Sequence, residues 1–228
     1  MVEGLEGASV PRDRICALLA AAGGGTRMGQ GPKAFLRHRG RTLLEHAVAY
    51  LLESAGRVIV GLPEDRLEEG RDLVGGGQVT CLPGGATKQE TVARLLPEAS
   101  EPVVLVHDVS QLSPQPALMA RVLAGLAGAD ACVPVLPNVV RGAAMLVDDE
   151  GWMACVVDRE RLAFSHTPQA FRRDALQAAC ARAAREGWLE NGVYALVQRA
   201  GGRVRTVAGD PDQIKLTFPE DLARLDPA

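Results

Sequence analysis

Short apolar runs alternate with segments of helical periodicity along most of this 228-residue chain. The run ICALLAA at residues 15–21 is apolar throughout, which is typical of a strand buried on both faces of a sheet. Residues 41–56 follow, with Leu44, Val48 and Leu52 spaced four apart, and this spacing predicts an amphipathic helix. Such alternation predicts an α/β, doubly wound fold whose mostly parallel sheet is covered by helices on both sides.

The same alternation continues toward the C-terminus. Further strands are expected at residues 57–63, 78–84, 102–108, 129–136 and 203–210. Helices are expected between them and after them, at residues 66–74, 91–99, 116–128, 172–187 and 219–225. No internal repeat or linker interrupts the pattern, so residues 1–228 are interpreted as one domain.

The pattern changes within residues 139–166. Two apolar segments there flank the acidic turn DDEG at residues 148–151, which predicts a hairpin. A hairpin of this kind would project from the α/β body, and a projecting apolar surface usually needs a partner. We therefore expect an arm that serves dimerisation.

Composition excludes several classes of function. The formal net charge is −3, so no basic field indicates nucleic-acid binding. No apolar run reaches the roughly 18–20 residues of a membrane span, and the polar, acidic start does not resemble a signal peptide. The five cysteines are scattered without a C-x-x-C pair, which is typical of reduced thiols. These observations predict a cytoplasmic protein that binds neither nucleic acid nor membranes.

A glycine-rich loop follows the first expected strand, in the stretch LAAAGGGTRMGQGPKAFL at residues 19–36. Glycine N–H groups can form a concave anion site because no side chain keeps the ligand away. The dinucleotide fingerprint GxGxxG fails, since from Gly23 its third glycine falls on Met28, and a P-loop fails because Lys33 follows a proline. A phosphate site that also uses Arg27 is one interpretation, and a plain strand-to-loop turn is the other.

Lysine occurs only three times, at Lys33, Lys88 and Lys215, whereas arginine supplies every other fixed cation. Either this distribution is chance, or lysine is kept where a compact ammonium group is needed. Asp108 ends the expected strand at residues 102–108, so it belongs to the same carboxyl edge of the sheet as the glycine loop. Ligands of doubly wound sheets bind at this edge.

Several motifs together carry a resemblance to a known family. They are AAGGGTRM with a following PK, GGATKQETV, VHD, TPQAF and IKLTFPEDL. In this order and spacing the chain, from about residue 15 to residue 225, resembles the 2-C-methyl-D-erythritol 4-phosphate cytidylyltransferases. The resemblance implies a Rossmann-like nucleotidyltransferase fold. The first motif, shared by many sugar nucleotidyltransferases, is matched by Ala21, Ala22, Gly23, Gly25, Arg27, Met28, Pro32 and Lys33.

The implied reaction joins CTP to a polyol phosphate and releases pyrophosphate, within isoprenoid precursor synthesis. Catalysis of this kind consists mostly of positioning and charge stabilisation. Arg27, Lys33 and Lys215 are the expected catalytic cations. The expected nucleotide-binding residues are the backbone and small side chains of Ala21, Ala22, Gly23, Gly25, Gly84, Gly85 and Thr91.

The resemblance also implies how the acceptor and a metal ion bind. Mg²⁺ prefers one or two carboxylates together with phosphate oxygens, and Asp108 and Asp212 are the candidate ligands. Lys215 and Arg159 are expected to receive the phosphate of the acceptor substrate, with Asp108 beside it. In the family the arm arginine reaches the neighbouring subunit, which implies a homodimer.

Two departures from the family pattern keep the acceptor open. The family usually has VHDAARP, but this chain has VHDVSQLSP, so Gln111 replaces an arginine. The stretch Asn191–Tyr194 replaces a usual T-D-[DE]-A segment. Both departures are expected on the acceptor side. They leave cytidylyl transfer to another polyol phosphate or phosphonate, or a non-catalytic nucleotide-binding paralogue, as alternatives.

Overall fold

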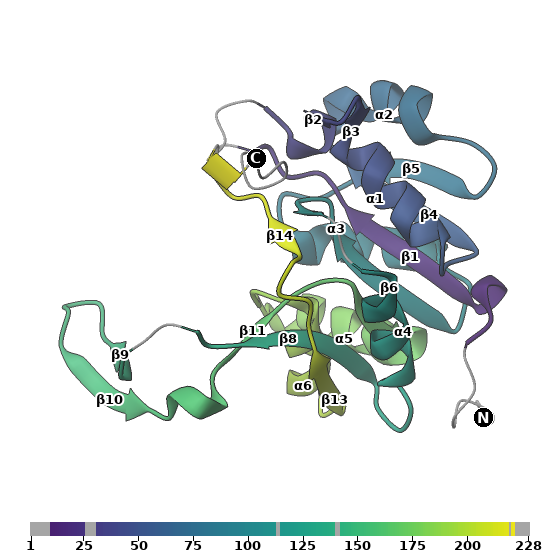
Figure 1. Ribbon diagram of the computed structural model, residues 1–228. Coiled ribbons are helices and arrows are strands. Elements are labelled where there is room, and N and C mark those ends of the chain that lie inside the picture. Colours follow the sequence, from purple (N-terminus) through teal and green to yellow (C-terminus); the bar gives the residue numbers. More distant parts are fainter. Residues whose placement is uncertain (1–9, 26–30, 113–114, 140–141, 219, 222–228) are drawn as a thin grey trace.

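An eight-stranded sheet forms the centre of the molecule in the computed structural model, which describes residues 10–25, 31–112, 115–139, 142–218 and 220–221 (Figure 1). Its strand order is β11-β8-β12-β6-β1-β4-β5, with β13 pairing β8. The strands are β1 (Ile15–Ala20), β4 (Arg57–Leu62), β5 (Val79–Pro83), β6 (Val103–Asp108), β8 (Ala131–Pro137), β11 (Ala163–Ser165), β12 (Gln169–Arg172) and β13 (Val204–Ala208).

The expected mostly parallel sheet is confirmed. Strand β1 runs parallel to both β4 and β6, and the pairs β4–β5 and β8–β13 are parallel too. Strand β12 lies antiparallel between β6 and β8, and β11 is antiparallel to β8, so the sheet is mixed at this end.

Helices cover both faces of the sheet, as predicted (Figure 1). One core joins the sheet to α1 (Leu43–Leu52), α2 (Leu67–Val74) and α4 (Pro116–Ala124). The second core joins it to α3 (Lys88–Leu95), α5 (Arg173–Glu186) and α6 (Val193–Arg199). Short 3-10 helices are η1 (Arg12–Arg14), η3 (Lys33–Phe35), η4 (Glu64–Arg66), η5 (Leu96–Glu98) and η6 (Arg159–Arg161).

Strand β6 shows how one strand serves both cores. Val103 and Leu105 pack into the α1 core, whereas Val104 and Val106 pack into the α3 core. Side chains alternate between the two faces of a strand. The residues that end β6 therefore point to opposite faces, His107 toward α1 and Asp108 toward α3.

Three short strand pairs lie outside the central sheet. Strands β2 (Arg37–His38) and β3 (Arg41–Thr42) form a tight hairpin before α1, and β7 (Gln111–Leu112) pairs antiparallel with β14 (Ile214–Lys215). Thr42 caps α1: its hydroxyl accepts from the Glu45 N–H at 3.2 Å, while its own N–H donates to the Glu45 carboxylate at 2.7 Å.

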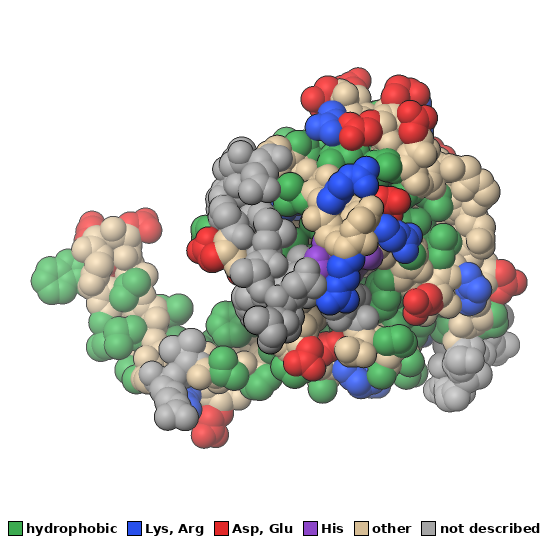
Figure 2. Space-filling view, turned by 45° about the horizontal axis from the view of Figure 1, so that its top comes forward, with side chains coloured by type: hydrophobic (Ala, Val, Ile, Leu, Met, Phe, Trp, Pro, Cys, Tyr) green, Lys and Arg blue, Asp and Glu red, His purple; other side chains and the backbone are tan. Residues whose placement is uncertain are grey.

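The hairpin expected in residues 139–166 is present. Strands β9 (Ala144–Val147) and β10 (Met153–Val157) pair antiparallel and project from the body of the molecule (Figure 1). Hydrophobic side chains cover this arm in Figure 2. Trp152 and Val156 on this arm are 72% and 69% exposed. Among the helices of the described residues, none combines the length and apolar character that a bilayer crossing requires.

Candidate active site

A cavity of about 280 Å³ opens at the carboxyl ends of β1 and β6. The glycine loop after β1 and Asp108 at the end of β6 meet there because Ala20 pairs with Asp108 in the sheet register. The expectation that they share one edge is confirmed. The lining residues are Ala20, Gly23, Gly24, Gly25, Lys33, Asp108, Val109, Ser110, Lys215 and Thr217.

The glycine loop leaves the sheet by a path that a side chain would block. Gly25 has a φ of 64°, and a Cβ there would collide with the Gly31 carbonyl oxygen. Just before the loop, Ala21 is buried and its N–H donates to the Gly61 carbonyl at 2.9 Å. Ala22 follows it, half-buried. The predicted cation Arg27 lies outside the described residues.

Asp108 is held as an anion in a buried setting. Its Oδ1 accepts from the Ser110 N–H at 3.0 Å and from the Ser110 hydroxyl at 2.7 Å. Burial by itself raises the pKa of Asp108, but Lys88, the Ser110 hydrogen bonds and Lys215 outweigh it, so the net pKa lies below its ordinary value.

All three lysines of the chain gather around this carboxylate. Lys33 and Lys215 line the cavity with it, and the Lys33 ammonium donates to the Leu216 carbonyl at 2.7 Å. Lys88 reaches it electrostatically from the start of α3. Burial lowers the pKa of Lys88, which Asp108 partly restores. Lys88 was not among the predicted site residues, although the rarity of lysine in the sequence already pointed to it.

Thr167 ties the end of β6 to the neighbouring loop. Its buried hydroxyl accepts from the Asp108 N–H at 3.2 Å, lies 3.0 Å from His107 Nδ1 and donates to Gln111 Oε1 at 2.6 Å. A cis peptide bond joins Thr167 to Pro168. Thr167 was expected only to stabilise a turn, but it also positions the backbone of Asp108.

Gln111, expected on the acceptor side, bonds to Thr167 and does not line the Asp108 cavity. Only 3% of Gln111 is exposed, and its amide oxygen accepts from both the N–H and the hydroxyl of Thr167. Its side chain is therefore committed to the loop rather than presented to the Asp108 cavity. Residues Asn191–Tyr194 do not line that cavity either, since they lead into α6. Among the described residues of the two departures, only Val109 and Ser110 in the segment VHDVSQLSP line the cavity, whereas Gln111 and residues Asn191–Tyr194 do not.

The second glycine segment, at Gly84 and Gly85, packs closely against the start of the glycine loop. A Cβ on Gly84 would collide with Ala22, so this glycine allows the two loops to pack together. The Thr91 hydroxyl accepts from the Gly85 N–H at 2.9 Å and donates to the Thr87 carbonyl at 2.9 Å. Thr91 was expected to border the nucleotide, but it is 2% exposed and shapes the loop from behind.

Two predicted residues lie away from the cavity. Asp212 is exposed on a turn, where its N–H donates to Asp210 Oδ1 at 3.0 Å, and it does not line the Asp108 cavity. Arg159 stands at the base of the arm, where its guanidinium donates to the Gly142 carbonyl at 3.3 Å. Within one chain, therefore, Arg159 does not complete this site.

The donor set suits a magnesium ion that is carried by phosphate. Among the described residues, no group of three or more His, Cys, Asp or Glu side chains could hold a metal by itself. Asp108 supplies one carboxylate, whose Oδ1 is engaged by Ser110. Mg²⁺ commonly binds through one or two carboxylates, with substrate phosphates and waters as its other ligands.

Comparisons with known proteins agree with this geometry. The chain is 42% identical over 208 residues to a 2-C-methyl-D-erythritol 4-phosphate cytidylyltransferase of Thermus thermophilus, covering 91% of this chain and 93% of that protein. The protein of the same name from Deinococcus radiodurans is 38% identical over 213 residues, covering 92% and 87%. A crystal structure of the enzyme from Thermus thermophilus superposes with a TM-score of 0.74 at 40% identity, covering 91% of this chain and 95% of that one. Because the profile of the family also matches residues 15–226, the chain belongs to the 2-C-methyl-D-erythritol 4-phosphate cytidylyltransferase family.

Proposed function

We propose that this protein transfers a cytidylyl group from CTP to 2-C-methyl-D-erythritol 4-phosphate. A phosphate oxygen of the acceptor attacks the α-phosphorus of CTP, the bond to the β-phosphate breaks, and pyrophosphate leaves. The observation that carries the proposal is the cavity in which the glycine loop, Lys33, Lys215 and Asp108 meet. Family membership identifies the pyrimidine nucleotide and the acceptor.

Different residues of the cavity bind or stabilise different phosphate groups of the two substrates. The backbone of Gly23 to Gly25 offers a side-chain-free surface to the triphosphate. Lys33, fixed by the Leu216 carbonyl, stabilises the charge that develops on the phosphates. Lys215, exposed on β14, binds the phosphate of the acceptor. Arg27 is assigned to the leaving pyrophosphate on the family motif alone.

Asp108 is the residue that would hold Mg²⁺, together with the substrate phosphates. A bound Mg²⁺ supplies charge neutralisation for the triphosphate. Asp108 stays ionised at neutral pH because its pKa is below the ordinary value, so it is ready to bind a cation. Its bonds to Ser110 fix one oxygen, which orients the carboxylate for binding.

We further propose that the arm forms a homodimer and that the molecule works in the cytoplasm. Exposed apolar side chains on β9 and β10 would be covered by a second copy. Arg159 at the base of the arm would then reach the partner's cavity, which explains why it lies away from its own.

The first test is pyrophosphate release by the purified protein with Mg²⁺, CTP and methylerythritol phosphate. Lys215→Ala is expected to lower kcat/KM by about 10²–10³-fold, because a preorganised cation is lost. Arg185→Ala, on the exposed side of α5, is the matched control and is expected to keep full activity. Release only with a different polyol phosphate would contradict the proposed acceptor. CTP binding without release for any acceptor would contradict transfer itself.

A further inference from the structure

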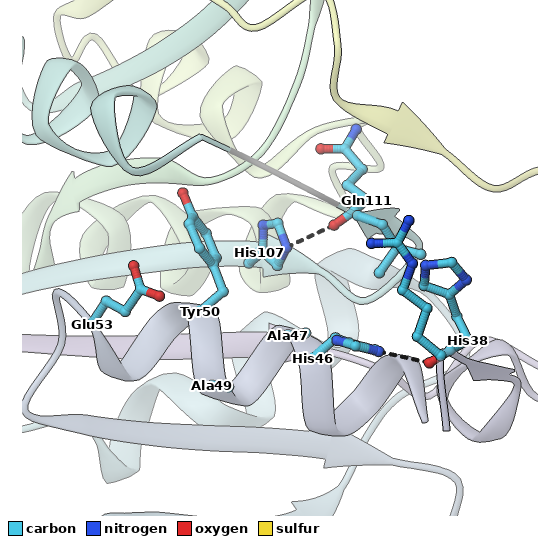
Figure 3. A pocket seen from close by; sticks show the side chains of 10 residues that line it. His38, His46, Ala47, Ala49, Tyr50, Glu53, His107 and Gln111 are labelled. Carbon is cyan, nitrogen blue, oxygen red and sulfur yellow. Dashed lines mark hydrogen bonds between the residues drawn. The ribbon is translucent and has the colours of Figure 1, made fainter. Parts of the chain in front are cut away.

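A second cavity of about 300 Å³ lies on the α1 side of the sheet (Figure 3). One helix face, the β2–β3 hairpin and the end of β6 with β7 form its walls. It shares no lining residue with the Asp108 cavity. The lining residues are His38, Arg39, His46, Ala47, Ala49, Tyr50, Glu53, His107, Gln111 and Leu112.

One end of this α1 cavity is rich in groups that bind anions. His38, Arg39 and His46 line that end, and Figure 2 shows histidine and basic side chains gathered at one place on this face. His46 Nε2 donates to the His38 carbonyl at 2.9 Å, and this bond joins α1 to the β2–β3 hairpin at that end. The chain has only four histidines, and three of them line this cavity.

The opposite part of the α1 cavity offers partners for hydroxyl groups. The Tyr50 hydroxyl is buried and has no hydrogen-bond partner among the described residues. Buried polar groups are nearly always paired, so an unpaired one points to a missing partner. Glu53, directly after the end of α1, lies three residues beyond Tyr50 and adds a carboxylate acceptor. A ligand hydroxyl could bond to either side chain.

Arg39, which lines this cavity, has a strained backbone conformation. Arg39 has a φ of 48°, in the left-handed region that glycine and asparagine favour. It precedes Gly40 in the two-residue turn that joins β2 to β3. This backbone conformation is unfavourable for an arginine, and strained residues cluster at ligand sites.

The α1 cavity is connected to the Asp108 cavity through adjacent residues. His107 Nε2 donates to the Gln111 carbonyl at 3.1 Å, and His107 Nδ1 lies 3.0 Å from the Thr167 hydroxyl that also holds the Asp108 N–H. Gln111 in β7 pairs with Lys215 in β14. A ligand that displaced the His107–Gln111 bond would therefore disturb both the Asp108 backbone and the strand that carries Lys215.

We propose that the α1 cavity is an inhibitory regulatory site for a small phosphorylated polyol or sugar. Its phosphate binds at the His38, Arg39 and His46 end, and its hydroxyl groups bond to Tyr50 and Glu53. Occupancy weakens the hold of β7 on β14 and so lowers the affinity for the acceptor at Lys215. The regulatory consequence rests on the proposed function, whereas the binding site does not.

Binding is tested first, with glycerol 3-phosphate as the probe. Imidazole C2–H resonances, assigned with His38→Gln and His46→Gln, are followed during titration of the full-length protein. We expect saturable shifts of both resonances, weaker shifts with inorganic phosphate and none with glycerol. Unmoved His38 and His46 resonances would overturn the proposal, and equal affinity for inorganic phosphate would overturn the polyol part of it.

Variants then separate this site from general phosphate binding. Arg39→Gly removes the charge while suiting the left-handed turn, and it is expected to weaken binding by about tenfold or more. Tyr50→Phe removes an unpaired hydroxyl and is expected to keep the fold while weakening binding of the polyol phosphate only. Arg41→Gln, on the same hairpin but outside this cavity, is the matched control and is expected to bind normally. Normal binding by Arg39→Gly would overturn the site.

Activity tests the regulatory consequence. Glycerol 3-phosphate is expected to raise the KM for methylerythritol phosphate in the natural protein and much less in Arg39→Gly. Equal inhibition of both proteins would mean competition at the Asp108 cavity and would overturn the coupling. If no acceptor supports pyrophosphate release, the proposed function fails, while the resonance titration still decides whether the α1 cavity binds the probe.

Discussion

At the scale of single residues, the Thr167 hydroxyl connects the Asp108 N–H with the side chains of His107 and Gln111. We expect Thr167→Val to destabilise the fold by about 1–3 kcal/mol, because it leaves the buried Asp108 N–H without an acceptor. It should also lower kcat, since Asp108 is no longer fixed. Denaturant unfolding and pyrophosphate release measure the two effects. Thr167→Ser, which keeps the hydroxyl, is expected to recover most of both, and a Val variant with natural stability would contradict the argument.

His107 gives the stability of the protein a pH dependence. Burial lowers the pKa of His107 to about 4, against 6.5 in the unfolded chain. As the pH falls below about 6.5, the unfolded state therefore binds a proton that the folded state refuses until about pH 4. Stability is fully present above this window and falls within it, by up to about 3 kcal/mol.

Urea unfolding between pH 7 and pH 4.5 measures this loss. His166 contributes with the same sign, because burial also lowers its pKa. The comparison with His107→Asn isolates the share that belongs to His107. We expect the variant to be less stable at pH 7 but to lose less stability on acidification. If the free energy of unfolding depended on pH equally in the variant and the natural protein, the pKa of His107 would not be lowered by folding.

The sequence predicted which charged residues meet at the Asp108 cavity, but it did not predict which of the expected contact residues are buried. The glycine loop with Lys33 and Asp108 could be placed together because they follow or end strands at one edge of the sheet, whereas Lys215 was placed by the family resemblance. The burial of Thr91 and Gln111 could not be foreseen, because it depends on hydrogen bonds to Gly85 and Thr167 that the local pattern does not encode. Threonine and glutamine serve equally well as ligand contacts and as loop supports.

At the scale of elements, local periodicity located α1, the strands of the parallel half and the β9–β10 hairpin. It missed α6, where the glycine of Asn191–Tyr194 suggested an altered loop but in the structure precedes the helix. It also gave no sign that β12 would insert antiparallel between β6 and β8. Strand order and direction follow from pairing between distant segments, which a linear pattern does not contain.

The five cysteines are expected to differ in reactivity toward thiol reagents, because only Cys155, on the arm, is exposed. Burial raises the pKa of Cys16 to about 12 and those of Cys132 and Cys180 to about 11, and it also raises that of Cys81. The thiolate is the reactive form, so these four react slowly. Cys155, exposed on β10, is expected to give about one fast equivalent with a thiol reagent under native conditions.

Cys155→Ser supplies the control for this labelling and should abolish the fast phase. If the arm pairs with a second copy, the fast rate should fall as protein concentration rises. Two or more fast equivalents per chain would contradict the burial of the other cysteines.

At the scale of the whole molecule, the two halves of the sheet have different tasks. The parallel strands β1 and β6 bring the glycine loop and Asp108 to one edge. The antiparallel half brings in the Thr167 loop from β12 and carries the arm between β8 and β11. Arg159, at the base of the arm, does not line the cavity in which Lys215 and Asp108 meet. Under the proposed function, a complete active site on this arrangement requires Arg159 from a second chain.

Subunit complementation tests that requirement. Arg159→Ala and Lys215→Ala are each expected to lower activity by about 10²-fold or more, because each removes a cation from the acceptor phosphate. In a twofold dimer that exchanges subunits freely, half of the molecules in an equal mixture are mixed dimers, and each of these has one site with both cations. The mixture should therefore recover about a quarter of the natural activity.

Arg185→Ala mixed with Lys215→Ala serves as the control and should show only the activity that the Arg185→Ala chains carry. If the mixture of Arg159→Ala and Lys215→Ala stays as inactive as its components while subunit exchange is complete, Arg159 does not act across the interface.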